Sequence, residues 1–505
     1  MGDRQNRFKI APLVGIGLAA AIAWLGAGEA WSATVGPNIG GGGPRISTPS
    51  ISTVGPRGGN FRIGPGTEPK GNPEIGDGRP PRKKGGSNIV IIPPGSGGPP
   101  KVTLGGSSGT PFRRIGTGVP PAGELRYIAN KVVIEIDGNP SREATAALAR
   151  RFNLTRIESV HLSLTNSTFF LWQIPDRRTV STVIKQLEAQ RGIKASPEYI
   201  YTLSQSEVAK AEANEKKEGD PAQYTLGKLR LPLAHSLAKG DQVLVAVIDS
   251  GVDMAHPEFG GVIADSFDTL DPAEPPHSHG TAIAGAIAAH SRLMGVAPSA
   301  KILAIRAFGE SKGSAEGTTF NILKSLDWAV SKGAQIINMS FAGPRDPALS
   351  RSLAAARQKG VVLIAAAGNA GPKSPPLYPA ADSNVIAVTA TDSDDKLFNA
   401  SNRGEHIAIA APGVDILLPS PGASYQVTSG TSFAAAHVSG IAALMLERKR
   451  DLKPDAVRRI LISTAKDLGP KGRDIYFGAG LADAYQALTA AEAGGSGPSN
   501  ASASR

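Results

Sequence analysis

The sequence predicts an α/β fold, in which a mostly parallel β-sheet carries helices on both faces and follows a smaller α+β domain. From about Leu226 onward, short apolar runs alternate with helical stretches. These runs are apolar on both sides, as expected for strands that are covered on both faces. Residues 123–204 instead show the order strand, helix, strand, strand, helix, strand. Residues 34–122 are dominated by glycine and proline and offer no apolar core.

The chain of 505 residues begins with a short basic stretch and an apolar run from Ala11 to Gly28. This pattern predicts a secretory signal peptide over residues 1–33. The run is also long enough to cross a bilayer, so an uncleaved N-terminal anchor is the alternative. The rest of the protein is expected outside the cytoplasm, either secreted, periplasmic or at the cell surface. Membrane association is expected only if the segment stays uncleaved.

Residues 34–122 predict a disordered arm. The net charge of +11 at neutral pH is concentrated in the first part of the chain, which includes "RPPRKK". Because this charge belongs to the arm and not to the folded part, no nucleic-acid partner is expected. The chain contains no cysteine. Disulfides, thiol nucleophiles and thiolate metal sites are therefore excluded.

Residues 123–204 predict a small ferredoxin-like domain. The segments "PSREATAALARRFN" and "RTVSTVIKQLEAQRG" have the spacing of amphipathic helices, and Ser141 is a candidate N-cap of the first. Four β-rich segments surround them, and the resulting β-α-β-β-α-β order is that of ferredoxin-like domains. The polar stretch 205–222 reads as a linker that carries a processing site.

Six apolar runs are predicted strands of the main sheet, and helical stretches such as "TTFNILKSLDWAVSKG" separate several of them. In open α/β sheets of this kind, the functional site lies at the carboxyl ends of the strands. Residues 493–505 predict a flexible tail. The six runs are 243–248, 302–307, 336–340, 361–367, 385–390 and 406–411.

Four polar residues lie at these strand ends or at the starts of helices: Asp249, His279, Asn369 and Ser432. Each alone has an ordinary interpretation, and Ser432 in particular has the position of a helix N-cap. However, a buried carboxylate needs a partner. A serine at a helix N-terminus also lies where unpaired N–H groups favour a developing negative charge. The four together are far more specific than any one of them.

The motifs "DSG", "HGT", "NMSFAG", "AAGNAG" and "GTSFAAAHVSG" make residues 223–492 similar to the subtilisin-like serine proteases, the subtilases. The resemblance implies a subtilisin-like catalytic domain whose triad is Asp249, His279 and Ser432. It also implies that Asn369 contributes to the oxyanion hole. The substrate-binding residues that it implies are Ser340, Phe341, Ala342, Gly343 and Gly368.

Subtilases of this kind carry a ferredoxin-like propeptide that assists folding and inhibits the enzyme. The resemblance therefore implies that residues 123–204 are a propeptide whose last strand enters the cleft, with a cut between Ser204 and Gln223. The expected function is that of a secreted, self-processing serine endopeptidase with protein or peptide substrates and its own propeptide as inhibitor. One alternative is a domain that is kept in the mature protein. Another is a weak or inactive binding protein that acts through its basic arm.

The sequence departs from the family pattern at two places that concern function. Ala342 replaces the usual glycine beside the substrate backbone, where its methyl group could crowd a substrate. The short segment "AAHSRLMGVAP" lacks the Asn-rich loop that binds calcium in many relatives. No cofactor is therefore expected and that strong calcium site is predicted to be absent, whereas weaker calcium sites are left open. Leu377 is a candidate for the floor of the main side-chain pocket.

Overall fold

The computed structural model describes residues 117–203, 209–211, 222–311 and 314–493, all within one unit, Ser107–Arg505. The predicted signal peptide, nearly all of the arm, most of the linker and the tail lie outside the described residues. No helix of the described chain combines the length and the apolar character that crossing a membrane requires.

The N-terminal part has the β-α-β-β-α-β order expected from the sequence, and its four strands form an antiparallel array in the order β2-β3-β1-β4. Side-chain oxygens of Ser141 and Thr179 accept hydrogen bonds from Ala144 N and Thr182 N, which starts both helices. The predicted N-cap at Ser141 is confirmed. The elements are β1 (Tyr127–Asp137), α1 (Arg142–Phe152), β2 (Thr155–Leu162), β3 (Ser167–Gln173), α2 (Val180–Glu188) and β4 (Ile193–Leu203).

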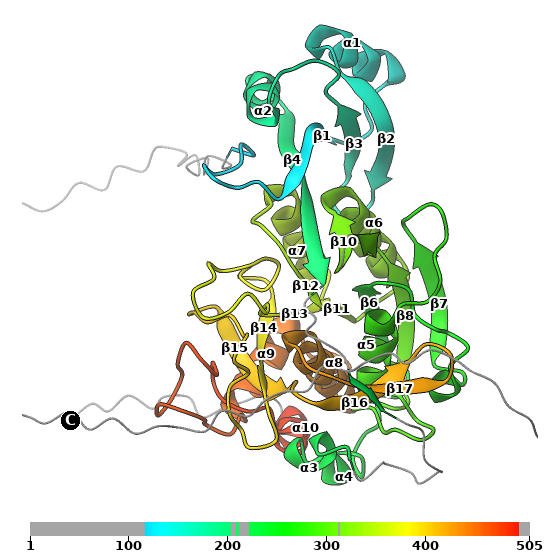
Figure 1. Ribbon diagram of the computed structural model, residues 1–505, viewed down its shortest axis with the longest axis vertical. Helices are drawn as coiled ribbons and strands as arrows, with labels where there is room; N and C mark the ends of the chain where they lie inside the picture. The colour runs from blue at the N-terminus through cyan, green and yellow to red at the C-terminus, as the bar shows by residue number, and fades with distance from the viewer. Residues whose placement is uncertain (1–116, 204–208, 212–221, 312–313, 494–505) are drawn as a thin grey trace, which may run out of the picture. The chain divides into compact units, whose positions relative to one another are not determined.

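The main sheet is parallel throughout and has the strand order β15-β14-β13-β11-β6-β8-β7 (Figure 1). All six apolar runs predicted as strands belong to it. The seventh, β7, was not predicted because it alternates half-buried and exposed residues at the edge of the sheet. The strands are β6 (Leu244–Asp249), β7 (Ile263–Asp268), β8 (Lys301–Arg306), β11 (Ile336–Met339), β13 (Val362–Ala366), β14 (Ile386–Thr391) and β15 (Ile407–Pro412).

Helices cover both faces of this sheet. Along β6, Val245 and Val247 belong to the cluster that holds α5 and α8, whereas Ala246 and Ile248 belong to the cluster that holds α6 and α7. The alternation follows from the period of two along a strand. The main helices are α5 (Ser278–Ala288), α6 (Thr319–Ser331), α7 (Pro347–Gln358), α8 (Thr431–Arg448), α9 (Pro454–Ser463) and α10 (Ala484–Glu492).

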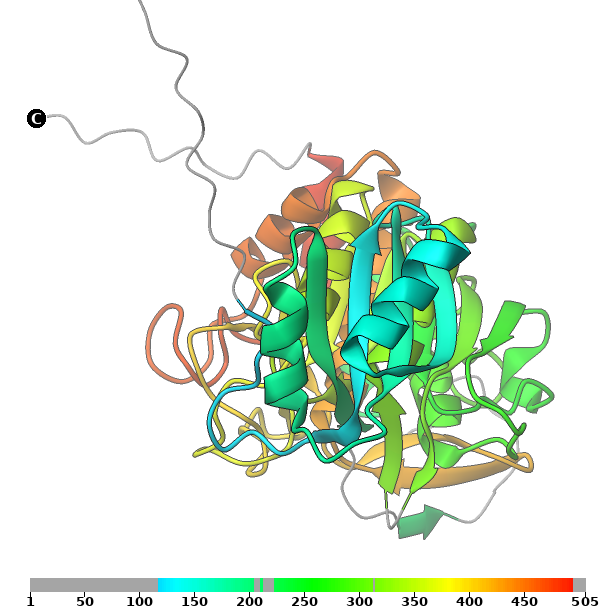
Figure 2. The same cartoon turned by 90° about the horizontal axis from the view of Figure 1, so that it is seen from above.

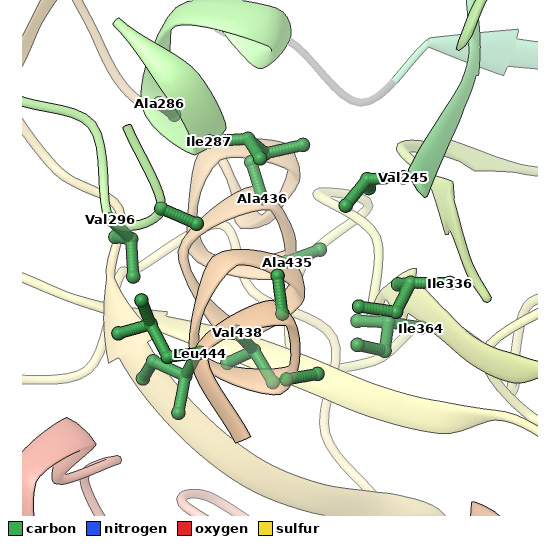
Figure 3. Close-up of a cluster of buried hydrophobic side chains, with 14 of the residues drawn as sticks. Val245, Ala286, Ile287, Val296, Ile336, Ile364, Ala435, Ala436, Val438 and Leu444 are labelled. Carbon is green, nitrogen blue, oxygen red and sulfur yellow. The ribbon is translucent and has the colours of Figure 1, made fainter. Parts of the chain in front are cut away.

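The central helix α8 is buried all round from Thr431 to Leu446 and lies against the sheet in part through small residues. Figure 3 shows Ala435, Ala436 and Val438 of α8 among Val245, Ile336 and Ile364 of the strands. Short side chains let helix and sheet approach closely without voids. The close packing holds the start of α8 beside the carboxyl ends of the strands.

Short strands and helices complete the fold around the sheet. The six short strands pair in two further sheets, and the pairing of β9 and β10 was not predicted, whereas β12 is the segment expected to bind a substrate strand. These elements are β5 (Ala209–Ala211), α3 (Thr225–Lys228), α4 (Leu231–Ala234), the 3₁₀ turn η1 (Pro257–Phe259), β9 (Gly309–Ser311), β10 (Ser314–Thr318), β12 (Phe341–Ala342), β16 (Ile416–Ser420) and β17 (Ser424–Thr428).

The N-terminal domain packs through one face of its sheet on α6 and α7 (Figure 2). Its other face carries α1 and α2. Glu135, which is buried, forms ion pairs with Lys194 of its own domain and with Arg351 of α7. The apolar residues in the shared cluster are Val133, Leu162, Phe169 and Leu171 on one side and Phe320, Leu323 and Ala348 on the other.

Candidate active site

The predicted aspartate and histidine meet at the carboxyl end of β6. Asp249 is the last residue of β6 and His279 is the second residue of α5. The Nδ1 atom of His279 lies 2.7 Å from Oδ1 of Asp249, and both side chains are fully buried. A hydrogen bond is electrostatically stronger in the low dielectric of the interior than in water. The hydrogen bond between Asp249 and His279 therefore fixes the His279 ring with Nε2 directed away from the carboxylate.

Ser250 holds the carboxylate of Asp249 in place. Its backbone N–H and its hydroxyl donate to Asp249 Oδ1 over 2.8 and 3.1 Å. Two buried atoms, Oδ2 of Asp249 and Nε2 of His279, have no hydrogen-bond partner in the described chain. Buried polar groups without partners are rare and call for an explanation such as a catalytic role.

The start of α5 comes unusually close to the end of β6. A Cβ atom on Gly280 would lie 2.4 Å from the carbonyl oxygen of Ser250, so only glycine fits after His279. His277 caps the helix, because its side chain accepts the N–H of His279 over 3.2 Å. Burial lowers the pKa of His277, which favours the neutral ring that such an acceptor requires.

Ser432 is the second residue of α8, and Gly430 occupies the N-cap. The interpretation of Ser432 as an N-cap is therefore wrong. Its hydroxyl donates to the carbonyl oxygen of Ser340 over 3.2 Å, and it is fully buried. The next side chain, Phe433, lies against the His279 ring with a centroid distance of 5.7 Å. The start of α8 thus lies beside the Asp249–His279 pair.

Asn369 follows β13 and is oriented by the start of α8. Its Oδ1 accepts hydrogen bonds from the hydroxyl and the N–H of Thr431, over 2.8 and 3.2 Å. Because the two ends of an amide point in opposite directions, this fixes the side on which the Nδ2 donors lie. Gly368 lies just before Asn369 with a φ of 103°, where a side chain would be strained and would contact Asn402.

The predicted substrate strand pairs with the end of the N-terminal domain. In β12, Phe341 is opposite Leu203 and Ala342 is opposite Thr202, in antiparallel register. On its other side β4 pairs with β10, so Thr202 is also opposite Glu316. β4 therefore lies as a middle strand between two strands of the larger domain. The methyl group of Ala342 does not prevent this pairing.

An aromatic side chain of β4 fills a pocket in the larger domain. Tyr201 is fully buried, and its ring meets that of Phe341 edge to face at a centroid distance of 5.8 Å. A Cβ atom on Gly343 would lie 2.3 Å from the Tyr201 ring, so this glycine makes room for it. Leu377, the candidate pocket floor, is buried and lies against Gly368, where an added Cβ would be 3.1 Å from its Cδ1.

Four residues that position the site were not singled out in the sequence. Three of them are direct neighbours of predicted residues in the motifs "DSG" and "GTSFAAAHVSG", so their place in these motifs is the signal that could have found them. Contacts across the fold, such as that of His277 with Ser250 over 3.0 Å, have no signature in the sequence. The four positioning residues are Ser250, His277, Thr431 and Phe433.

A buried carboxylate anchors the loop at which the calcium-binding segment of many relatives was expected to be missing. Glu258 accepts the N–H groups of Ser291, Arg292 and Leu293 over 2.8, 3.0 and 3.0 Å. It also accepts the hydroxyl of Tyr425 over 2.8 Å. Four donors thus already occupy the two oxygens, which does not fit a role as a calcium ligand. Within the described residues, no three His, Asp or Glu side chains are placed to hold a metal ion.

Residues 240–480 match the model of the subtilase family. Subtilisin E of Bacillus subtilis (strain 168) is 38% identical over 268 residues, which cover 51% of this chain and 69% of that protein. Thermitase of Thermoactinomyces vulgaris is 35% identical over 274 residues, covering 53% of this chain and 95% of that protein.

The fold is also similar to a solved structure, that of fervidolysin from Fervidobacterium pennivorans, which is described as a keratinolytic enzyme related to subtilisin. The two share 25% identity with a TM-score of 0.62. The alignment covers 74% of this chain and 62% of the fervidolysin chain, which is less than two thirds of the latter.

Proposed function

Since the chain belongs to the subtilase family of serine proteases, we propose that it is a secreted serine endopeptidase made as a self-processing zymogen. Its substrates are proteins or peptides that add to β12 as an extended strand. The observation that carries the catalytic part is the buried 2.7 Å contact of His279 with Asp249 beside Ser432. Export is inferred from the signal-like residues 1–33, which lie outside the described residues.

The catalytic cycle begins with a proton transfer from Ser432 to His279. The Ser432 hydroxyl turns from the Ser340 carbonyl to Nε2 of His279 and attacks the substrate carbonyl carbon, while Nε2 takes the proton. His279 then gives this proton to the leaving amine, and an acyl-enzyme remains. His279 Nε2 then takes a proton from a water molecule that attacks the acyl carbon, the ester bond to Ser432 breaks, and His279 returns the proton to Ser432 as the acid product leaves. Asp249 keeps Nδ1 protonated and stabilises the imidazolium form throughout.

The negative oxygen of each tetrahedral intermediate lies between two donors, the backbone N–H of Ser432 and the side-chain amide of Asn369. The Ser432 N–H belongs to the first turn of α8, at the end of the helix where the backbone N–H groups point outward along the helix axis. The helix dipole adds a favourable field at this end. Thr431 positions Asn369 in advance, so little reorganisation is needed when the charge develops.

The N-terminal domain is the inhibitory propeptide in this proposal. Its strand β4 takes the place that a substrate would have on β12, and Tyr201 fills a pocket as a substrate side chain would. All three triad side chains are fully buried in this arrangement. A chain held in this manner excludes other substrates until it is removed.

Two strands, β4 before the linker and β5 within it, restrict the region proposed for the first cut. On one side of Ser432, β4 ends at Leu203 opposite Phe341. On the other side, β5 pairs with β17, which leads into α8. β4 thus ends beside the proposed substrate strand β12, and β5 lies beside the strand that precedes α8, which supports a cut between Leu203 and Ala209. We place the cut in this interval, inside the wider window of Ser204 to Gln223 that the sequence suggested.

The test compares the wild-type chain with the Ser432→Ala variant by intact mass and N-terminal sequencing. The proposal expects the wild type to shorten to a form that begins between Ser204 and Ala209. The variant stays long, because replacing the nucleophile removes the cleavage but leaves the fold unchanged. A new N-terminus beyond Ala209 would contradict the proposed interval, although not the protease.

If both proteins stay long and folded and neither hydrolyses casein, the protease proposal fails. The alternative, a binding protein that works through its basic arm, would then be tested next. If both proteins shorten equally, a contaminating protease is the cause and the proposal of self-processing is wrong.

A further inference from the structure

A cleft of about 690 Å³ lies within the N-terminal domain, apart from the candidate active site. One wall is the face of α1 that carries Thr145, Ala146 and Ala149. The opposite wall comes from β2 and β3 and includes Phe170 and Trp172. The volume lies within the range of small-molecule pockets. Short side chains on α1 leave this space between the helix and the sheet.

The charged groups that line the cleft are both cations, beside neutral hydroxyl and amide side chains. Arg142 of α1 and Arg156 of β2 both line it, and neither guanidinium has a partner among the described residues. No acidic side chain of the described chain belongs to the lining. Two positive charges that line one cleft repel each other, and a bound anion would relieve that repulsion.

A buried donor without a partner adds an independent observation. Trp172 is 1% exposed, and its Nε1–H has no hydrogen-bond partner among the residues that the structure describes. The indole N–H is only a donor, and a buried tryptophan usually finds an acceptor for it. The aromatic ring of Phe170 lies 6.0 Å from that of Trp172 and is also buried. The cleft thus combines an aromatic wall with two arginine side chains and the Trp172 N–H, and its lining includes no carboxylate of the described residues.

We propose that this cleft binds a small organic anion of the aromatic carboxylate class. The carboxylate is held by Arg142 and Arg156, since guanidinium groups match carboxylates in geometry and charge. The aromatic body packs on Phe170 and Trp172. Because the ligand binds the folded domain and not the unfolded chain, it stabilises this domain.

The test uses the full chain with Ser432→Ala, which stays in one piece whether or not the wild type processes itself. 4-Phenylbutyrate is titrated into it by calorimetry, with 4-phenylbutanamide as the uncharged probe of the same shape. The variants are Arg142→Gln combined with Arg156→Gln, and Trp172→Phe. Arg150→Gln is the matched control, because Arg150 lies on the same helix but outside the lining.

The proposal expects one 4-phenylbutyrate per chain and binding of the amide that is at least tenfold weaker. The double arginine variant weakens carboxylate binding at least tenfold, Trp172→Phe weakens it severalfold, and Arg150→Gln leaves it unchanged. Absence of binding at millimolar concentration would overturn the proposal. So would binding that the double variant retains while its circular dichroism spectrum matches that of the parent. Equal affinity for acid and amide would show an apolar cleft and contradict an anion site.

Discussion

The orientation of Asn369 is set by one neighbouring residue. Thr431 donates to the carbonyl end of the Asn369 amide through both its hydroxyl and its N–H. Thr431 also accepts the N–H of Gly368 over 3.1 Å, so the turn after β13 and the start of α8 are held together. The position of the Asn369 amide in the proposed oxyanion hole therefore depends on both the backbone N–H and the side-chain hydroxyl of Thr431.

Replacing Asn369 by alanine is expected to lower kcat by about 100- to 1000-fold with a small change in KM, because the lost donor acts mainly in the transition state. Steady-state hydrolysis of a peptide substrate measures both constants. Asn384→Ala is the control, since Asn384 pairs with Asp382 away from the site. A kcat within threefold of the wild-type value would remove Asn369 from the proposed mechanism.

At the scale of elements, β4 carries a carboxyl group into the interface with α6. Glu198 is 1% exposed, and its Oε1 accepts the N–H of Phe320 in the first turn of α6 over 3.4 Å. Burial raises its pKa to about 7, hydrogen bonds from Thr318 and from the N–H of Phe320 oppose the rise, and the nearby carboxylate of Asp346 adds to it. Asp346, at the start of α7, also has a raised pKa because of its burial.

We expect the complex of the propeptide with the processed enzyme to weaken as the pH rises. Glu198 has an ordinary pKa of 4.5 when it is exposed and about 7 when it is docked. Docking therefore favours the protonated form: affinity is highest below pH 4.5, falls as pH rises towards 7, and is then constant. Between these limits the loss approaches about tenfold per pH unit.

The measurement is the dissociation constant of added segment 117–203 on processed enzyme between pH 5 and 8. Glu198→Gln imitates the protonated form and is expected to bind with a much flatter pH profile. An equal slope for wild type and variant would assign the pH dependence to other groups, such as Asp346. A flat wild-type profile would contradict the prediction itself.

How far the sequence predicted these elements depended on where each strand buries its side chains. β6 and β13 were predicted because burial on both faces leaves continuous apolar runs. β7 was missed because it lies at the edge of the sheet, where every second residue is exposed and the strand has no continuous apolar run. β12 has two residues, and its pairing with β4 joins segments far apart in the chain, which no local pattern records. The candidate site residues were found through motifs, whereas the contacts that orient them came only from the fold.

At the scale of the whole molecule, the N-terminal domain has two apolar sheet faces but only one set of helices. Its own helices cover the face that includes Val132 and Ile134. The face that includes Val133 and Phe169 is covered by α6 and α7 of the larger domain. The stability of the smaller domain therefore includes apolar burial that exists only while it is docked.

The segment 117–203 alone is expected to be marginally stable or unfolded. Burial of one large apolar side chain stabilises by roughly 1.5–3 kcal/mol, and four such side chains lose their cover in the free domain. The free energy of unfolding of a domain of this size is only about 4–12 kcal/mol. Urea unfolding followed by far-UV circular dichroism measures this, with and without processed enzyme. A free segment that unfolds at the same urea concentration as the docked one would contradict the expectation.

The loop that Glu258 anchors has a consequence for the surroundings in which the protein can work. Its three N–H groups donate to a carboxylate of the same chain, so no bound ion is needed to satisfy them. We therefore expect that EDTA does not destabilise this loop and does not lower the unfolding temperature of the protein through it. Glu258→Gln, which weakens the acceptor, is expected to lower that temperature by several degrees. Calorimetric scans of both proteins with and without EDTA would test this, and a chelator effect lost in the variant would reveal an ion at Glu258.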